Sequence, residues 1–254
     1  MRRWLNIEYK WLYNKYINDK LSIAQIAEEL KIDSSSVRRW LKNYNIHSRS
    51  KGEGRHLRNK ENHCNLSPEA IEWINGELLG DGCIQKSSNY TVKFGYSSKH
   101  PEYIEYIRDT LKGFGIEQAG KINKYYHKTM DCYSYHYCSL CYPELMIIYK
   151  KWYPNNKKTI PNDIQLTPLT LRQHYIGDGC LTHRDDCRPY IHLATCGFSI
   201  SGVELLIRQL IELGINATRV ITSNAISIPV DSTKDFLKYI GECPVKCYIY
   251  KWAY

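Results

Sequence analysis

Two aspartates, Asp81 and Asp178, have the spacing to do chemistry together, because each stands in a Gly-Asp-Gly-Cys motif and the motifs lie roughly a hundred residues apart. Each motif follows a stretch that we expect to be helical, so each carboxylate meets the negative C-terminal end of a helix dipole. If the two helices are neighbours, each carboxylate also repels its twin, and a bound cation removes both conflicts. Carboxylate oxygens with the carbonyl oxygens of Gly80 and Gly177 suit a hard ion, which favours Mg²⁺, with Mn²⁺ able to substitute. In the alternative interpretation the aspartates only cap helices.

The two motifs belong to an internal repeat. Residues 74–82 match residues 171–179, and similar segments follow each: two strand-like stretches, a helix, two more strands and a last helix. The repeat predicts one half over residues 67–160, a short linker over 161–170 and a second half over 171–254. Antiparallel strands with helices on one face form an α+β unit, and a tandem duplicate packs about a pseudo-twofold axis. The predicted fold is therefore a pseudo-twofold tandem αββαββα repeat.

A small all-α domain is predicted over residues 1–48. Two segments with the apolar spacing of one helix face meet at a short turn, where Asp33 or Ser34 can cap the second helix. This arrangement resembles a helix-turn-helix with its recognition helix at residues 34–43. The outward face of that helix carries the expected DNA contacts Ser35, Arg38, Arg39 and Lys42. A three-helix protein-interaction module is the alternative. Residues 49–66 are polar and basic, which is typical of a linker.

Charge and composition favour an intracellular protein that binds nucleic acid. The net charge is +9, and residues 1–66 hold 14 Lys and Arg against 7 Asp and Glu. No apolar run is long enough to span a bilayer, and the start lacks the apolar stretch of a secretory signal, so we expect no membrane partner. The ten cysteines are scattered, and free thiols are the default expectation. One cluster also permits a zinc site: Cys132, His136, Cys138 and Cys141.

The paired motifs resemble the two motif helices of the LAGLIDADG homing endonuclease family. The resemblance covers residues 67–254 and is closest to the single-chain, two-motif branch encoded in group I introns, which shares the runs at 156–161 and 250–252. It implies a monomer that binds a long, asymmetric site in double-stranded DNA and hydrolyses both strands with a divalent metal. It also points to Lys158 and Lys251 as catalytic lysines. The repeat supports this pairing independently, because each lysine follows its aspartate by a similar distance, 77 and 73 residues.

Further DNA contacts are expected from polar residues along the strands, because a saddle-shaped sheet fits the major groove and can read base edges. These candidates are Lys86, Lys93, Lys99, Lys121, Lys124, Arg184, Arg188 and Arg219. Two positions depart from the family pattern. Gln173 replaces an interface glycine, which predicts looser or asymmetric packing of the second motif helix. Cys196 stands where relatives often carry a glutamine beside the active site.

Two other functions stay open at this point. One is a DNA-binding transcriptional regulator that uses the same scaffold without cleaving, although the retained aspartates and lysines argue against it. The other is a maturase that binds its host intron RNA and helps it to splice.

Overall fold

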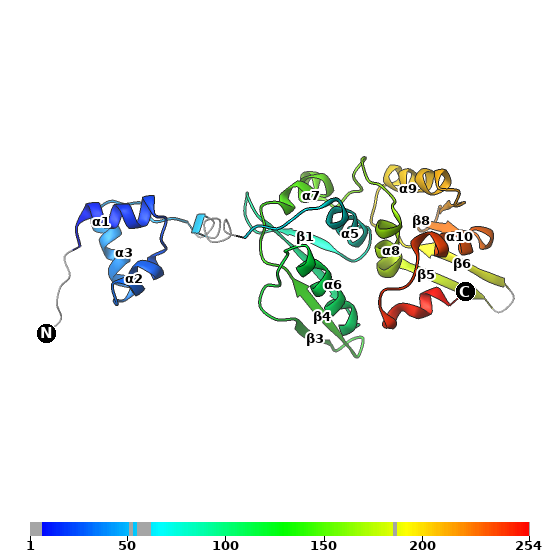
Figure 1. Cartoon of the computed structure of the whole chain (residues 1–254), viewed down its shortest axis with the longest axis horizontal. Coiled ribbons are helices and arrows are strands. Elements are labelled where there is room, and N and C mark those ends of the chain that lie inside the picture. The colour runs from blue at the N-terminus through cyan, green and yellow to red at the C-terminus, as the bar shows by residue number, and fades with distance from the viewer. Residues whose placement is uncertain (1–6, 51–52, 55–61, 185–186, 254) are drawn as a thin grey trace. The chain divides into compact units, whose positions relative to one another are not determined.

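The computed structural model of the chain describes residues 7–50, 53–54, 62–184 and 187–253, and for residues 183–184 and 187–188 it describes the backbone only. The chain divides into two units, Met1–Glu61 and Asn62–Tyr254 (Figure 1). Each unit has its own cluster of buried apolar side chains. We therefore describe each unit by itself.

The N-terminal unit is helical. Its elements are α1 (Tyr9–Tyr13), a π-helical turn (Asn14–Asn18), α2 (Ile23–Glu29) and α3 (Ser34–Asn43). Ser22 caps α2 in a reciprocal capping box with Gln25, and the Asp33 carboxylate caps α3 by accepting from Ser35 N at 2.7 Å. The two caps fix where α2 and α3 begin, and the apolar faces of the two helices bury Ile26 and Val37 in a shared core. The small all-α domain expected from the sequence is confirmed.

Arg49 closes this unit from beyond its last helix. Its backbone N–H donates to the Tyr16 hydroxyl at 2.8 Å, and its guanidinium donates to the carbonyls of Lys20 at 3.0 Å and Leu21 at 2.7 Å. The guanidinium also lies 3.9 Å from the centre of the Tyr16 ring. The first residue of the expected linker is thus held by the helical unit. At its other end, Asn65 N donates to the Phe114 carbonyl of the larger unit at 3.1 Å.

The larger unit contains the expected repeat. The first half consists of α5 (Pro68–Leu79), β1 (Cys83–Lys86), β2 (Val92–Ser98), α6 (Pro101–Gly113), β3 (Asn123–His127), β4 (Cys132–Cys138), α7 (Leu145–Trp152) and a short 3₁₀ turn (Pro154–Asn156). The second half consists of α8 (Pro168–Asp178), β5 (Gly179–Arg184), β6 (Cys187–Leu193), α9 (Ile200–Glu212), β7 (Thr218–Val220), β8 (Ala225–Ile228), α10 (Val230–Ile240) and a C-terminal 3₁₀ helix (Lys246–Trp252). The α+β class with two αββαββα halves is confirmed.

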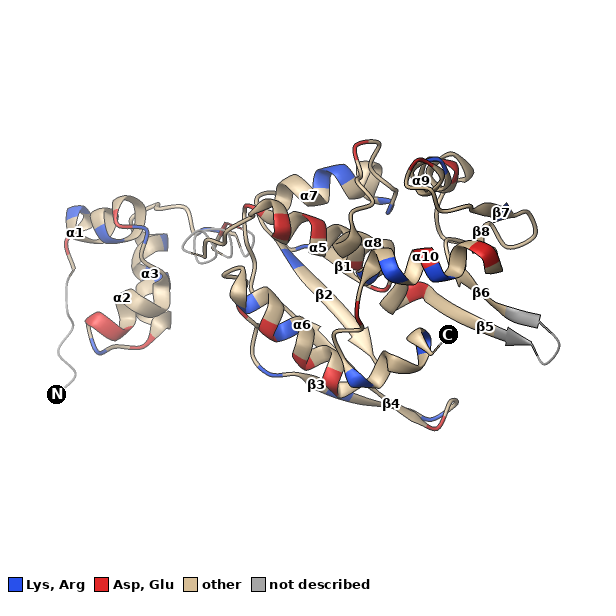
Figure 2. Ribbon diagram, turned by 45° about the vertical axis from the view of Figure 1, so that its right-hand side comes forward, with Lys and Arg blue, Asp and Glu red and all other residues tan. Residues whose placement is uncertain are grey.

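Each half holds one four-stranded antiparallel sheet with the same strand order, β1-β2-β4-β3 in the first and β5-β6-β8-β7 in the second. The helices of each half pack on one face of its sheet (Figure 2). Strand residues alternate accordingly, since Ile84 pairs with Phe94 on the buried face whereas Gln85 pairs with Lys93 on the other. Within the described residues of this unit, each sheet therefore keeps one face free of helices.

The seam between the halves is the packing of α5 against α8. Both helices begin alike, with Ser67 or Thr167 as N-cap and a proline directly after it. A methyl group built on Gly76 would lie 2.5 Å from the Thr170 carbonyl oxygen and 2.7 Å from the Gln173 Cβ. The glycine of one helix therefore makes room for the glutamine of the other. The packing is asymmetric, as expected from Gln173, but it is close rather than loose.

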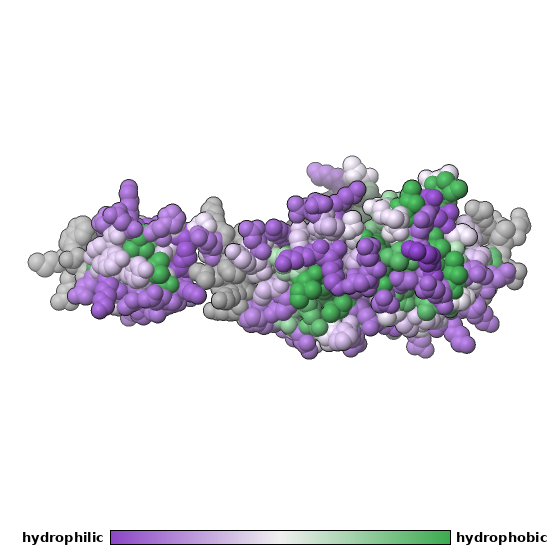
Figure 3. All heavy atoms as spheres, turned by 90° about the horizontal axis from the view of Figure 1, so that it is seen from above, coloured by the Kyte–Doolittle hydropathy of each residue, from purple (hydrophilic) through white to green (hydrophobic). Residues whose placement is uncertain are grey.

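The surface of both units is mainly hydrophilic in the view of Figure 3, where hydrophilic side chains break up the apolar patches. None of the helices in the described part of the chain has the length and apolar character needed to cross a membrane.

Candidate nucleic-acid interface and active site

The two aspartates meet where the motif helices end. Asp178 is the last residue of α8, and Asp81 follows α5 after Gly80. At this point the backbones touch, because a methyl group on Gly177 would lie 3.2 Å from Asp81 N and one on Gly80 would lie 3.6 Å from Asp178 N. The glycine before each aspartate thus permits the close approach that brings both carboxylates to the seam.

Each lysine predicted from the repeat lies at the motif of its own half. Lys158 Nζ donates to the carbonyls of Gly80 at 3.0 Å and Gly82 at 2.9 Å. Lys251 Nζ is buried and donates to the carbonyls of Tyr175 at 3.3 Å, Ile176 at 2.6 Å and Gly177 at 3.4 Å. A lysine ammonium at a helix C-terminus satisfies carbonyls that have no partner within the helix and opposes the negative end of the dipole. Both lysines therefore place a positive charge beside the aspartates.

The four charged groups perturb one another. Partial burial, followed by repulsion from Asp81, raises the pKa of Asp178 to about 6. Partial burial also raises the pKa of Asp81, against the attraction of Lys251 and Lys158. Burial lowers the pKa of Lys251 to about 8, although both aspartates favour its charged form. Solvent still reaches the exposed Asp81 from one side, so the pair is open to a ligand while water is partly excluded around it.

A buried polar layer lies below the aspartates, and sequence reasoning singled out only Gln173 among its members. Glu77 accepts a hydrogen bond from the Tyr103 hydroxyl at 2.6 Å, and Gln173 Nε2 donates to the Tyr106 hydroxyl at 3.0 Å. His174 is fully buried, with its ring beside the backbone of Ala194. Glu77 and His174 occupy equivalent repeat positions, four residues before each aspartate. That polar position on otherwise apolar helix faces was the signal that could have revealed the layer.

The open faces of the sheets carry only some of the expected DNA contacts. Lys93 lies on the open face of the first sheet, whereas strand pairing puts Lys86 opposite Val92, Lys124 opposite Tyr135 and Arg219 opposite Ile226, on the faces that carry the core. Lys99 and Lys121 are exposed just outside strands. Arg184 and Arg188 lie in β5 and β6, but their side chains lie outside the described part of the structure.

The register reveals other polar residues on the open faces. These are Gln85, Ser97, Asn123 and His136 in the first half, and Thr182, His192, Thr218 and Ser227 in the second. Sequence reasoning missed them because it searched for cationic side chains, whereas neutral amides, hydroxyls and imidazoles also read base edges.

The zinc alternative is not formed at Cys132, His136, Cys138 and Cys141, all of which the structure describes. His136 Nε2 instead shares hydrogen bonds with the hydroxyls of Ser134 at 2.8 Å and Ser97 at 3.3 Å. The nine cysteines whose side chains the structure describes are all free. Cys196 is exposed near the C-terminal end of β6, in the turn before α9.

The helical unit presents the basic surface expected of it. Ser35, Arg38, Arg39 and Lys42 are all exposed on α3, opposite the buried Val37 and Leu41.

Comparisons with known proteins agree with this division into units. The family model described as the LAGLIDADG DNA endonuclease family matches residues 71–236, and the model described as a homeodomain-like domain matches residues 11–53. The chain is 27% identical to the uncharacterized protein MJ1098 of Methanocaldococcus jannaschii over 201 residues, covering 78% of this chain and 76% of that protein. It is 26% identical to the cytochrome b mRNA maturase bI2 of Debaryomyces hansenii over 162 residues, covering 57% of this chain and 56% of that protein.

Among solved structures, the homing endonuclease I-WcaI bound to its DNA recognition sequence aligns with a TM-score of 0.65 at 19% identity. The alignment covers 82% of this chain and 96% of that chain, so the two proteins share a fold.

Proposed function

The chain belongs to the LAGLIDADG DNA endonuclease family, and from this premise we propose that it is a site-specific homing endonuclease that hydrolyses both strands of double-stranded DNA. The observation that carries the proposal is the seam: two carboxylates from equivalent motifs lie together, each with a lysine of its own half beside it. A structural helix cap requires neither the duplication nor the partial burial of both carboxylates.

The donor groups at the seam fit a divalent cation. Asp81 and Asp178 are hard oxygen ligands whose mutual repulsion a cation relieves. The Gly80 carbonyl accepts from Lys158 and the Gly177 carbonyl from Lys251, but a carbonyl oxygen has two lone pairs, so one stays available for a metal. Mg²⁺ is the natural ion for such ligands, and Mn²⁺ can replace it. Bound there, it supplies Lewis acidity for phosphodiester hydrolysis.

The protein's own residues bind and orient the DNA around this ion site. The polar open faces of the two sheets line the duplex, and the two different halves read a long, asymmetric site as one monomer. Lys158 and Lys251 screen the negative charge that develops on the phosphate during cleavage. The basic face of α3 adds phosphate contacts that strengthen binding.

The direct test is cleavage of a randomised DNA library by the purified protein with Mg²⁺ or Mn²⁺, followed by sequencing of the ends. We expect recurrent cut sites with wild-type protein. Asp81→Asn and Asp178→Asn should reduce cleavage at least about a hundredfold while leaving DNA binding within a few fold. The matched control is Asp109→Asn, which alters an exposed aspartate on α6 that pairs with Arg108.

Cleavage that persists in the double aspartate variant would contradict the assignment of the site. Specific binding without cleavage by wild-type protein would favour the non-cleaving regulator instead.

A second candidate function is an RNA maturase, because one relative of the chain is a cytochrome b mRNA maturase. It is tested by adding the protein to the unspliced intron RNA of the host gene and measuring splicing. Asp81→Asn protein should support splicing as well as wild type if RNA binding uses the fold without the metal site.

A further inference from the structure

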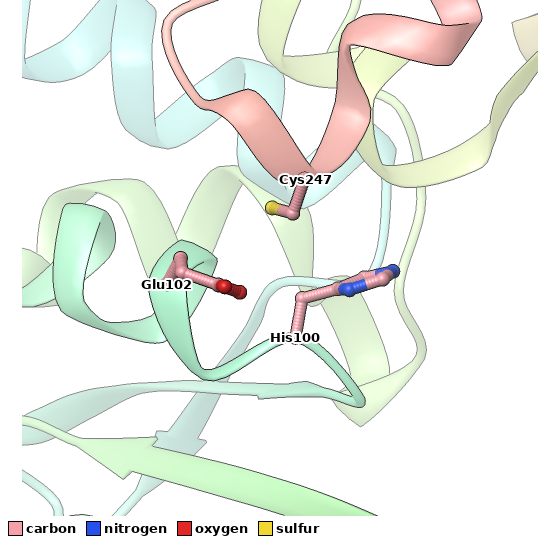
Figure 4. A group of neighbouring side chains, drawn as sticks. All are labelled: His100, Glu102 and Cys247. Atoms are coloured by element: carbon pink, nitrogen blue, oxygen red, sulfur yellow. The ribbon is translucent and has the colours of Figure 1, made fainter.

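Outside the aspartate seam, three side chains with metal-binding atoms converge from distant parts of the chain. His100 and Glu102 lie at the start of α6 in the first half, and Cys247 lies in the C-terminal 3₁₀ helix of the second half. One ring nitrogen of His100, a carboxylate oxygen of Glu102 and the Cys247 Sγ all lie within 4.8 Å of one another (Figure 4). They form the one such group of three found among the described residues.

We propose that His100, Glu102 and Cys247 bind a Zn²⁺ ion that fastens the C-terminal 3₁₀ helix to α6. Thiolate, imidazole and carboxylate are the three ligand types that zinc takes in proteins, whereas Mg²⁺ avoids sulfur and imidazole. The site is therefore chemically distinct from the oxygen-only aspartate pair.

The geometry is close to that of a zinc site. Zinc bonds of about 2.0–2.3 Å place tetrahedral ligand atoms about 3.3–3.8 Å apart, about 1.0–1.5 Å less than the 4.8 Å within which the three atoms lie here. Glu102 is exposed, so its carboxylate can rotate the remaining distance. Three protein ligands leave a fourth position for water.

His100 and Cys247 are partly buried and Glu102 is exposed, so a metal ion from solution can reach the three side chains. The neutral imidazole and the deprotonated thiol are the forms that bind metals, so binding releases the thiol proton.

A zinc ion at this site would hold the C-terminal 3₁₀ helix in place. Tyr248 already packs its ring against His100, with centroids 4.9 Å apart, and its hydroxyl lies 3.2 Å from Ser98 Oγ. Lys251 is one helical turn further along the same 3₁₀ helix, bonded to the end of α8. Zinc at Cys247 thus anchors the segment that delivers Lys251 to the seam. The proposal does not depend on whether the protein cleaves DNA.

Titration of the full-length protein with Co²⁺ tests the site, because a cobalt–thiolate bond produces a near-ultraviolet charge-transfer band that carboxylates do not. We expect a band that saturates at one equivalent and is displaced by Zn²⁺. Cys247→Ser should abolish it, and His100→Ala and Glu102→Gln should each weaken binding at least about tenfold. The exposed Cys196→Ser is the matched control and should leave the band unchanged.

A band that survives in Cys247→Ser, or an absent band in wild type, would overturn the proposal. Glu102→Gln alters an exposed side chain and therefore keeps the result interpretable if Cys247→Ser folds poorly. Thermal unfolding gives an independent readout: Zn²⁺ should raise the melting temperature of wild type and of Cys196→Ser, but not that of Glu102→Gln at the same concentration.

Discussion

Replacement of Asp178 by asparagine should stabilise the metal-free protein. Partial burial and the neighbouring Asp81 raise the pKa of Asp178 from 3.8 to about 6, so the folded state binds this proton more tightly than the unfolded chain. Wild-type stability therefore falls as the pH rises from about 4 to about 6 and stays lowered above that range. Asparagine keeps the shape of the side chain but has no charge, so the variant should escape this loss.

The magnitude follows from the shift in pKa. One pKa unit corresponds to about 1.4 kcal/mol, so a shift of about two units gives an upper limit of about 3 kcal/mol. Solvent reaches the half-buried carboxyl and screens the repulsion, which reduces the expected gain to about 1–2 kcal/mol. For a unit of this size, that gain corresponds to roughly 3–6 °C in melting temperature.

Differential scanning calorimetry in EDTA at pH 8 and at pH 4 measures this effect. Asp178→Asn should melt higher than wild type at pH 8 and equally at pH 4, and added Mg²⁺ should narrow the gap at pH 8 by stabilising wild type. Asp109→Asn is the control, because Arg108 lowers the pKa of Asp109 and its loss should give no stabilisation. An equal gain for Asp178→Asn at both pH values, or no gain at pH 8, would refute the idea that burial and repulsion make the ionised Asp178 carboxylate destabilising in the metal-free protein.

Three further outcomes are expected. In urea unfolding, Gly76→Ala should lower the stability of the larger unit by about 2 kcal/mol, because the added methyl group would overlap the backbone of α8. Gly113→Ala is the control, since a methyl group there meets open space and should be neutral or slightly stabilising. The DNA cleavage rate should fall above about pH 8, because burial lowers the pKa of Lys251 to about 8 and its ammonium loses its charge above that pH. A rate that stays level to pH 10 would argue against a role for that charge. Arg38→Ala and Lys42→Ala should each weaken DNA binding and reduce the slope of log affinity against log salt by about one, and an unchanged slope would place α3 away from phosphate.

The sequence predicted those features that the repeat imposes twice. The order of elements, the meeting of Asp81 and Asp178 and the position of a lysine beside each motif follow from two halves in register. The face of a sheet on which a residue lies could not be predicted, because it depends on strand pairing. Lys124 was expected on the face that reads DNA, but its pairing with Tyr135 puts it on the core face. Cys247 and His100 are separated by most of the larger unit, so no local pattern links them.

The buried polar layer below the aspartates carries no net charge between α5 and α8. Glu77 and His174 occupy equivalent positions in the repeat, and one is an acid and the other a base. Burial raises the pKa of Glu77 to about 8 and lowers that of His174 to about 4, so near pH 7 the acid keeps its proton and the imidazole stays without a second one. Both are then neutral, and the duplicated helices bury polar groups without burying net charge. The charges that remain belong to Asp81, Asp178 and Lys158, at the end of the helices where solvent, cations and a DNA backbone can reach them, and to the buried Lys251, whose ammonium is bonded to carbonyls at the end of α8.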